Sequence, residues 1–300
     1  YRYLRYMKRV LLILATNLAI IIVASFTLSL LGVGSYLDGT GLNLQALLIF
    51  CFIFGMAGSF ISLLLSKKIA KWSMGVRLID KPANRNEEWL VQTVNRQAQN
   101  AGIGKPEIGI FPAEQANAFA TGWNRNNALV AVSEGMLQRF ENDEIESVMG
   151  HEIGHVANGD MVTLALIQGV VNTFVMFLAR VVGFAVDRVV LKNERGLGIG
   201  YFVTTILAEI VLAILASMIV FWFSRRREFR ADEEGARLGS RLGMINALER
   251  LKTDAQQPTP MPDSMKAFGI TGGKSKGWRK LFMTHPPLDE RIAALRNMTD

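Results

Sequence analysis

Long stretches without charged residues set the strongest limit on how this chain of 300 residues can fold. Val10 to Leu31 and Leu42 to Leu65 hold 22 and 24 residues without a charge, and Met161 to Ala179 holds 19. Leu197 to Ser224 holds 28 residues and is interrupted only by Glu209. An α-helix needs about 20 apolar residues to cross the hydrocarbon core of a bilayer. The sequence therefore predicts four transmembrane helices, with buried helices of a soluble core as the alternative for the last two.

Basic residues at the ends of these stretches indicate their orientation. Four precede the first stretch and four follow the second, whereas the loop between them, at residues 32–41, has none. Cytoplasmic loops carry an excess of lysine and arginine, so both ends of this hairpin are expected in the cytoplasm. The basic run at residues 225–230 agrees, whereas the predicted loop from Arg180 to Arg195, which includes four basic residues, weakens the indication. Four crossings would place both termini on the cytoplasmic side.

The charge pattern also bears on which partners the chain can bind. The net charge of +7 is gathered at the ends of the apolar stretches, where it meets anionic lipid headgroups, so no nucleic-acid partner is expected. Gly272 to Ser275 could be taken for a phosphate-binding loop, but Phe268 stands where that loop requires glycine, so no nucleotide is expected. A signal peptide is the alternative for the first stretch, although its length and the second crossing favour an uncleaved anchor.

The apolar hairpins divide the chain into four parts. They are an N-terminal transmembrane hairpin at residues 1–65, a first polar part at 66–160, a second transmembrane hairpin at 161–224 and a second polar part at 225–300. Both polar parts are expected on the cytoplasmic side, where they must meet to form one domain.

Three β-rich stretches in the first polar part predict a small sheet. They are residues 107–111, 118–123 and 128–132, and the last two are joined across Asn124 to Asn127, which has the residues of a hairpin turn. An edge strand here would accept a peptide through main-chain hydrogen bonds, and a hairpin with a structural role alone is the alternative. Helical spacing of apolar residues predicts helices at residues 86–100 and 226–251.

Two of the three histidines stand in His151-Glu152-Ile153-Gly154-His155, which is the HExxH pattern. Asn142 is placed to cap a helix that leads into this pattern. Residues four apart lie on the same face of an α-helix, so both imidazoles can bind one metal ion while Glu152 faces the open coordination position. The pattern predicts a zinc hydrolase in which Glu152 is the general base.

A third ligand must lie elsewhere in the chain, because a catalytic zinc ion takes three protein ligands and leaves one position for water. Asp160 follows His155 too closely to match the zinc peptidases that have a nearby third ligand. Glu228 and Asp232 lie four residues apart on a predicted helix, as a ligand and the carboxylate that orients a liganding imidazole would. Spacing alone leaves four candidates for the third ligand: Glu228, His285, Glu233 and Glu234.

Four segments of the chain resemble, in order, the HtpX family of bacterial inner-membrane zinc endopeptidases, which are relatives of the CAAX prenyl proteases. They are Asn117 to Gly122, His151 to Asp160, Glu228 to Asp232, and His285-Pro286-Pro287 followed by Arg291. The departures from the family pattern are small: Gly150 stands where alanine is commoner, and Arg230 where histidine is frequent. Neither departure touches a proposed ligand.

The resemblance implies the composition of the metal site. Glu228 would be the third ligand, and together with His151 and His155 it would hold one zinc ion per chain. Asp232 would be the carboxylate that orients the imidazole of His151. The expected fold class is α+β: a mainly helical integral membrane protein with four transmembrane helices and a zincin-like cytoplasmic protease domain that contains a small β-sheet.

The resemblance also implies a reaction and its substrates. Glu152 would take a proton from a zinc-activated water, His285 and Arg291 match positions that steady the oxyanion, and Asn117 would contribute to substrate binding. The expected activity is cleavage of unfolded, misfolded or damaged membrane proteins. It would take place on the cytoplasmic side of the bacterial inner membrane, as part of protein quality control and the stress response.

A catalytically inactive zinc-binding membrane scaffold is the alternative function. A structural zinc site would be closed by four protein ligands, usually with cysteine, and the only cysteine, Cys51, lies inside an apolar stretch. A transporter that uses Glu209 would need paired broken helices, and none is evident. Glu209 is expected to make a polar contact with other helices, because a carboxylate is costly in lipid.

Overall fold

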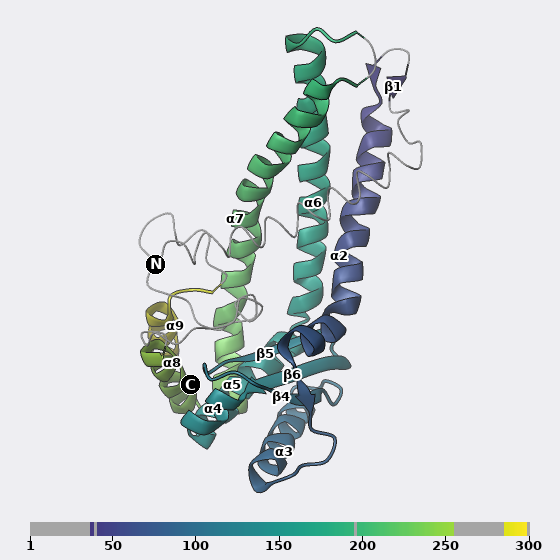
Figure 1. The fold of residues 1–300 in the computed structure, drawn as a ribbon. Helices are drawn as coiled ribbons and strands as arrows, with labels where there is room; N and C mark the ends of the chain where they lie inside the picture. Colours follow the sequence, from purple (N-terminus) through teal and green to yellow (C-terminus); the bar gives the residue numbers. More distant parts are fainter. Residues whose placement is uncertain (1–36, 39–40, 195–196, 255–284, 299–300) are drawn as a thin grey trace. The chain divides into compact units, whose positions relative to one another are not determined.

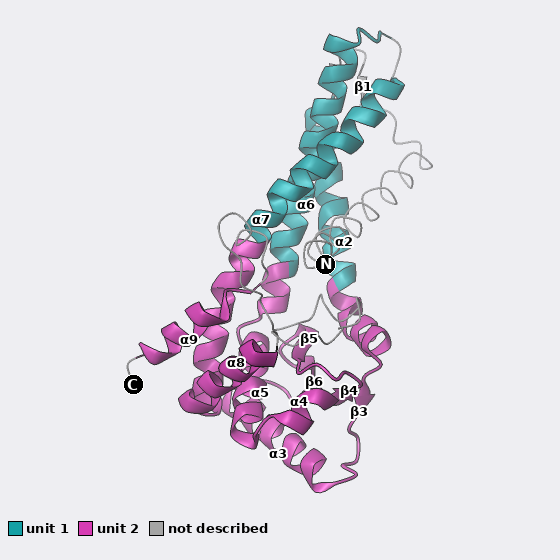
Figure 2. Ribbon diagram, turned by 60° about the vertical axis from the view of Figure 1, so that its left-hand side comes forward, with its two compact units in different colours: residues 1–62, 165–220 teal, residues 63–164, 221–300 magenta. Residues whose placement is uncertain are grey.

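The computed structural model describes residues 37–38, 41–194, 197–254 and 285–298. The first apolar stretch and the segment Gly272 to Ser275 lie outside these residues. The chain forms two compact units, and each is built from two separate segments (Figure 2). Unit 1 comprises residues 1–62 and 165–220, and unit 2 comprises residues 63–164 and 221–300.

Three long helices contribute to unit 1 and are labelled in Figure 1: α2 (Leu44–Met74), α6 (Asp160–Ala185) and α7 (Ile199–Leu238). A π-helical segment, η1 (Val186–Val190), continues α6, and the short strands β1 (Leu37–Asp38) and β2 (Gly41–Leu42) form a hairpin before α2. All three helices are long and apolar enough to cross a membrane. Of the four predicted transmembrane helices, these three lie in the described part of the chain.

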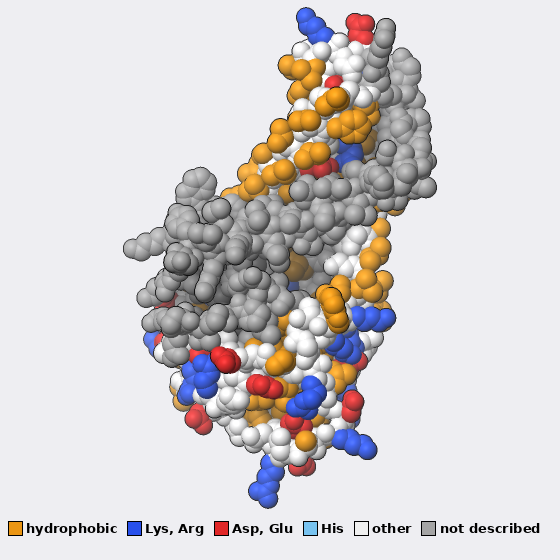
Figure 3. Space-filling model, viewed as in Figure 1, with side chains coloured by type: hydrophobic (Ala, Val, Ile, Leu, Met, Phe, Trp, Pro, Cys, Tyr) orange, Lys and Arg blue, Asp and Glu red, His pale blue; other side chains and the backbone are white. Residues whose placement is uncertain are grey.

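The surfaces of these helices in unit 1 differ from those of a soluble bundle. Leu47 and Phe50 of α2 pack against Val175 and Met176 of α6 in a buried cluster. Large apolar side chains point outward elsewhere, and Leu207 of α7 is 58% exposed. Figure 3 shows such side chains in orange along the long helices. An exposed surface of this kind is expected where lipid takes the place of water.

A buried ion pair joins two helices within unit 1. Arg180 does not lie in a loop, because α6 continues to Ala185, and its Nη1 donates a hydrogen bond to Glu209 Oε1 of α7 at 3.0 Å. The apolar residues that follow Arg180 allow the helix to continue, and the opposite charge of Glu209 offsets the cost of burying the guanidinium. The expected polar contact of Glu209 is therefore present. Arg180 is therefore not one of the basic loop residues that weaken the predicted orientation.

Unit 2 contains a four-stranded mixed sheet in the order β3-β4-β6-β5. Its strands are β3 (Arg77–Leu78), β4 (Glu107–Phe111), β5 (Ala118–Asn124) and β6 (Asn127–Ser133). β4 and β6 are parallel, the other pairs are antiparallel, and β5 forms an edge. The prediction of a small sheet with a β5–β6 hairpin is confirmed. β3 was not predicted, because a strand of two residues is too short to show an alternation of polar and apolar residues.

Helices cover both faces of this sheet. One face packs on a large core shared by α3 (Arg85–Asn100), α5 (Asn142–Ala157), α8 (Arg241–Asp254) and α9 (Leu288–Arg296). On the other face, Ala70 and Met74 at the end of α2 pack on Phe111, Phe119 and Leu129. A strand that is covered on both faces reads as a continuous apolar run, which explains the composition of β6.

Two predicted helix boundaries are wrong in detail. The predicted helix at residues 226–251 is divided, because α7 ends at Leu238 and α8 begins at Arg241. Ser240 lies between them, and its Oγ accepts a hydrogen bond from the backbone N–H of Gly243 at 2.9 Å, which caps α8. The short helix α4 (Glu134–Arg139) precedes α5, whose cap is Glu141 instead of Asn142. A capping box with Glu144 accounts for that shift.

Candidate metal centre

Glycine residues let α5 and α7 approach closely in unit 2. A Cβ on Gly154 of α5 would lie 2.7 Å from Glu234 Cβ, and a Cβ on Gly235 of α7 would lie 2.7 Å from the carbonyl oxygen of Ser147. Real Cβ atoms essentially never come this close to another atom, so side chains at these positions would push the helices apart. The close approach brings Glu228, two helical turns before Gly235, opposite the HExxH residues of α5.

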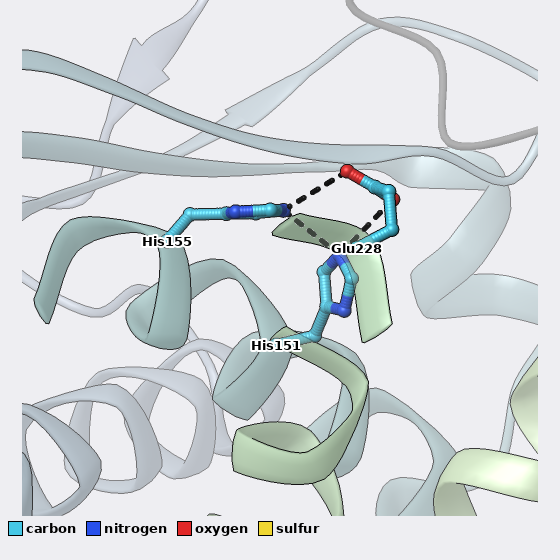
Figure 4. Close-up of side chains that lie close together, drawn as sticks. All are labelled: His151, His155 and Glu228. Carbon is cyan, nitrogen blue, oxygen red and sulfur yellow. Dashed lines mark hydrogen bonds and ion pairs between the residues drawn. The ribbon is translucent and has the colours of Figure 1, made fainter. Parts of the chain in front are cut away.

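His151, His155 and Glu228 converge on one point (Figure 4), and their ligand atoms all lie within 4.8 Å of one another. His151 Nε2 is 3.2 Å from His155 Nε2, and Glu228 Oε1 is 3.4 Å from His155 Nε2. Glu228 Oε2 is 3.8 Å from His151 Nε2. Donors that bind one tetrahedral ion at about 2.0 to 2.1 Å lie about 3.3 Å apart, so this group fits a divalent metal ion.

A second carboxylate, that of Asp232, contacts the ring of His151. Asp232 lies one turn after Glu228 on α7, and its Oδ1 is 2.9 Å from His151 Nδ1. Arg291 of α9 donates to both oxygens of Asp232, from Nε at 2.7 Å and from Nη2 at 2.5 Å. Asp232 therefore lies beside His151, at the position predicted for the carboxylate that orients this imidazole.

The comparisons with known proteins agree with this geometry. The family model of peptidase family M48 matches residues 84–299, a range that contains all three members of the metal group. Protease HtpX of Hahella chejuensis is 64% identical over 289 residues, which cover 96% of this chain and 99% of the relative. The chain belongs to the HtpX proteases of peptidase family M48.

Two further matches are a second protease HtpX and a solved structure. Protease HtpX of Pseudomonas putida strain W619 is 61% identical over 292 residues, covering 97% of this chain and 99% of the relative. Among solved structures, the crystal structure of S. mikatae Ste24p matches with a TM-score of 0.57 and 18% identity. That match covers 91% of this chain and 65% of the other, so this chain spans less than two thirds of the Ste24p length. It supports the fold alone.

His285 and Arg291 both lie beside the candidate metal centre, and both contact Glu228. His285 Nδ1 is 2.7 Å from Glu228 Oε2, and Arg291 Nη1 is 3.3 Å from the same oxygen. The Arg291 side chain is 0% exposed, and two of its nitrogens are held by Asp232. These contacts favour a role in holding carboxylates, and the oxyanion role implied by the resemblance stays a prediction for both residues.

Neighbouring charges shift the pKa values of two members of the metal group. Burial opposes ionisation of Glu228, but His285, His155 and Arg291 outweigh it and hold the pKa of this carboxyl well below its usual range. Burial also lowers the pKa of His155, but hydrogen bonds to Asp160 and Glu228 reverse that effect and raise the pKa to about 10. Both shifts arise because opposite charges lie side by side in this buried group.

Asp160 is the partner of His155 that spacing did not reveal. Its Oδ2 lies 2.7 Å from His155 Nδ1. The spacing argument set Asp160 aside as a ligand and gave it no other role. The signal that could have found it is Asn158-Gly159, which allows the chain to turn back on the preceding helix.

Glu152 and Asn117 occupy buried positions near the elements of the site. Glu152 follows His151 on α5, is 4% exposed, and its charge adds to the field that raises the pKa of His155. Asn117 directly precedes the edge strand β5 and is 1% exposed. Its backbone N–H donates to Ser133 Oγ, and its carbonyl accepts from the Ser133 N–H, which fixes the start of the strand. The catalytic role of Glu152 and the substrate-binding role of Asn117 stay predictions.

Proposed function

We propose that this membrane metalloprotease is a zinc endopeptidase that cleaves unfolded or misfolded membrane proteins on the cytoplasmic side of the bacterial inner membrane. The observation that carries the proposal is the convergence of His151, His155 and Glu228 at the spacing of a three-ligand site. Two imidazoles and one carboxylate form a donor set typical of catalytic zinc in peptidases, which leaves the fourth position to water. One such group supports one zinc ion per chain.

The chemistry then follows from the residues around that position. A zinc ion held by His151, His155 and Glu228 would supply Lewis acidity, which would lower the pKa of a water molecule to about 7 and polarise the scissile carbonyl. Glu152 accepts the proton of that water and returns it to the leaving amine. His285 and Arg291 donate to the oxyanion as the resemblance implies, and one well-placed donor contributes roughly 3 kcal/mol in comparable sites.

Substrates are proposed to bind along the edge strand β5. An extended peptide can add to an exposed sheet edge through main-chain hydrogen bonds, which do not depend on its sequence. This mode suits proteins whose common property is an unfolded segment, and it places Asn117 next to the bound chain. The cytoplasmic side is supported by the basic residues that flank the apolar stretches.

One experiment separates this function from that of a catalytically inactive zinc-binding scaffold. The protein is purified in detergent, loaded with zinc and incubated with casein, with and without a chelator. The proposal expects casein fragments that disappear with chelator and with Glu152→Gln, a variant that keeps the three ligands. The absence of chelator-sensitive fragments from the unaltered, zinc-loaded protein would support the scaffold. The structure gives the scaffold little support, because the metal group of the described residues has three ligands instead of four.

A further inference from the structure

We propose that Asp160 is a positioning residue that holds His155 in the orientation and tautomer required to bind the metal ion. The proposal rests on the metal site described above and deepens it. It assigns a role to a residue that the spacing of the motif excludes as a ligand, and it connects the second histidine to the start of α6.

A turn at Gly159 makes the contact between Asp160 and His155 possible. On an uninterrupted helix, a residue five positions beyond His155 would lie about 140° around the axis and would face away from it. α5 instead ends at Ala157, and Gly159 adopts a left-handed conformation with φ of 67°. α6 begins at Asp160, so the chain turns back and the carboxylate meets His155 Nδ1 at 2.7 Å.

This hydrogen bond decides which nitrogen of His155 can bind metal. In a neutral imidazole, one ring nitrogen carries the proton and the other carries the lone pair. An ionised Asp160 can only accept, so the proton lies on Nδ1 and the lone pair lies on Nε2. Nε2 is the atom that lies 3.2 Å from His151 Nε2 and 3.4 Å from Glu228 Oε1. The tautomer that Asp160 selects is therefore the one that faces the other two ligands.

The surroundings of Asp160 fix its own position. The residue is 2% exposed and occupies the first turn of α6, where unpaired backbone N–H groups favour a negative charge. Arg227 of α7 donates from Nη1 to the backbone oxygen of Asp160 at 2.9 Å. Arg230 Nη2 lies 3.6 Å from Oδ1, the oxygen that does not bind His155. Asp160 thus ties His155 both to the first turn of α6 and to α7, the helix that carries Glu228.

The arrangement repeats the one at the other histidine. His151 has Asp232 at its Nδ1 at 2.9 Å, and His155 has Asp160 at its Nδ1 at 2.7 Å. Removal of a carboxylate that orients a metal-binding histidine typically costs 10- to 100-fold in metal affinity or activity. We expect an effect of that size at Asp160, and it should be visible in the metal-binding step itself.

The test measures metal binding in the full-length protein in detergent. The unaltered protein, Asp160→Ala and Asp160→Asn are titrated with Co²⁺ in competition with a chromophoric chelator, and the visible spectrum of the bound cobalt is recorded. Asp143→Ala is the matched control, because it also removes a first-turn aspartate, at the start of α5. Asp160→Ala should weaken cobalt binding about 10- to 100-fold and change the cobalt absorption bands. Asp160→Asn should lose less, because its amide oxygen can still accept from Nδ1, and the control should match the unaltered protein.

The outcomes separate positioning from a general effect on folding. Thermal unfolding of each metal-free variant shows whether it is folded. If Asp160→Ala is not folded, the cobalt affinity and spectrum of Asp160→Asn test the proposal instead. A folded Asp160→Ala variant with the cobalt affinity and spectrum of the unaltered protein would overturn the proposal, and where Asp160→Ala does not fold, an Asp160→Asn variant that shows no loss would overturn it. Weaker binding with a changed spectrum and an unchanged unfolding temperature would support it. Failure of the proposed function looks different, because then the unaltered protein binds cobalt but the zinc-loaded form leaves casein intact.

Discussion

Replacement of Gly235 by alanine should weaken metal binding, because it forces α5 and α7 apart beside the metal centre. The new Cβ would lie 2.7 Å from the Ser147 carbonyl oxygen, 3.0 Å from Met244 Sδ and 3.2 Å from His151 Cβ. Ordinary contact begins at 3.4 Å, so the backbone of α5 and α7 must separate by about 0.7 Å at this point. The carbonyl oxygen belongs to a helix backbone and cannot rotate away as a flexible side chain would.

The expected loss of zinc affinity follows from the cost of overpacking and from the narrow range of metal–ligand distances. Extra methyl groups in a well-packed interior typically cost about 1 to 3 kcal/mol. Metal-ligand distances tolerate changes of only about 0.2 Å, and Glu228 lies on the same rigid helix as Gly235. If about 1.4 kcal/mol of the strain is relieved by moving Glu228 away from the histidines, zinc affinity falls about tenfold.

The assay is competition for zinc with a chromophoric chelator, alongside thermal unfolding of the metal-free protein. Gly150→Ala is the matched control, because its Cβ would approach Leu238 Cβ at 3.1 Å and Gly235 Cα at 3.2 Å, which requires a shift of only about 0.3 Å. The control should bind zinc nearly as well as the unaltered protein. A folded Gly235→Ala variant with unchanged zinc affinity would refute the idea that the close helix approach sets the ligand geometry.

Three further predictions concern other parts of the chain. Glu152→Gln should keep one zinc per chain by elemental analysis yet lose casein cleavage, and normal cleavage would rule out the general-base role. Glu209→Ala leaves Arg180 buried without its carboxylate and should destabilise the protein by about 3 to 5 kcal/mol in unfolding experiments, whereas the double variant with Arg180→Ala should recover part of that loss. Hydrogen bonds from the Ala83 backbone and from Arg77 hold the pKa of Glu87 below its usual 4.5. The ionised Glu87 side chain therefore stabilises the folded protein above about pH 4.5, and this stabilisation is lost as the pH falls through the lower pKa of the folded state. Glu87→Gln should make the unfolding temperature depend less on pH in the acidic range.

Much of the fold could be read from local sequence patterns. Uncharged stretches marked α2, α6 and α7, because a helix that crosses lipid must be apolar over a fixed length. β-rich composition and turn residues marked β4, β5 and β6, and the HExxH spacing placed two predicted ligands on one face of α5. In each case the signal lies within one short segment of the chain. The first apolar stretch lies outside the described residues, so that helix stays a prediction.

The remainder depends on contacts between distant segments. Nothing local shows that Arg291 meets Asp232, a residue 59 positions earlier, or that Arg180 pairs with Glu209. Spacing alone left Glu228 as one of four candidates for the third ligand, and the family resemblance was needed to prefer it. Asp160 was missed because helical spacing assumes an uninterrupted helix, and Gly159 interrupts it.

The ligand set of the bound ion is the central claim, and zinc K-edge X-ray absorption of the zinc-loaded protein tests it most directly. The account predicts two imidazoles and additional oxygen ligands at about 2.0 to 2.1 Å, with no sulfur scatterer. Glu228→Ala should remove or rearrange this first shell while both histidines remain. A sulfur scatterer at about 2.3 Å, or a spectrum that Glu228→Ala leaves unchanged at full zinc occupancy, would contradict the proposed metal centre.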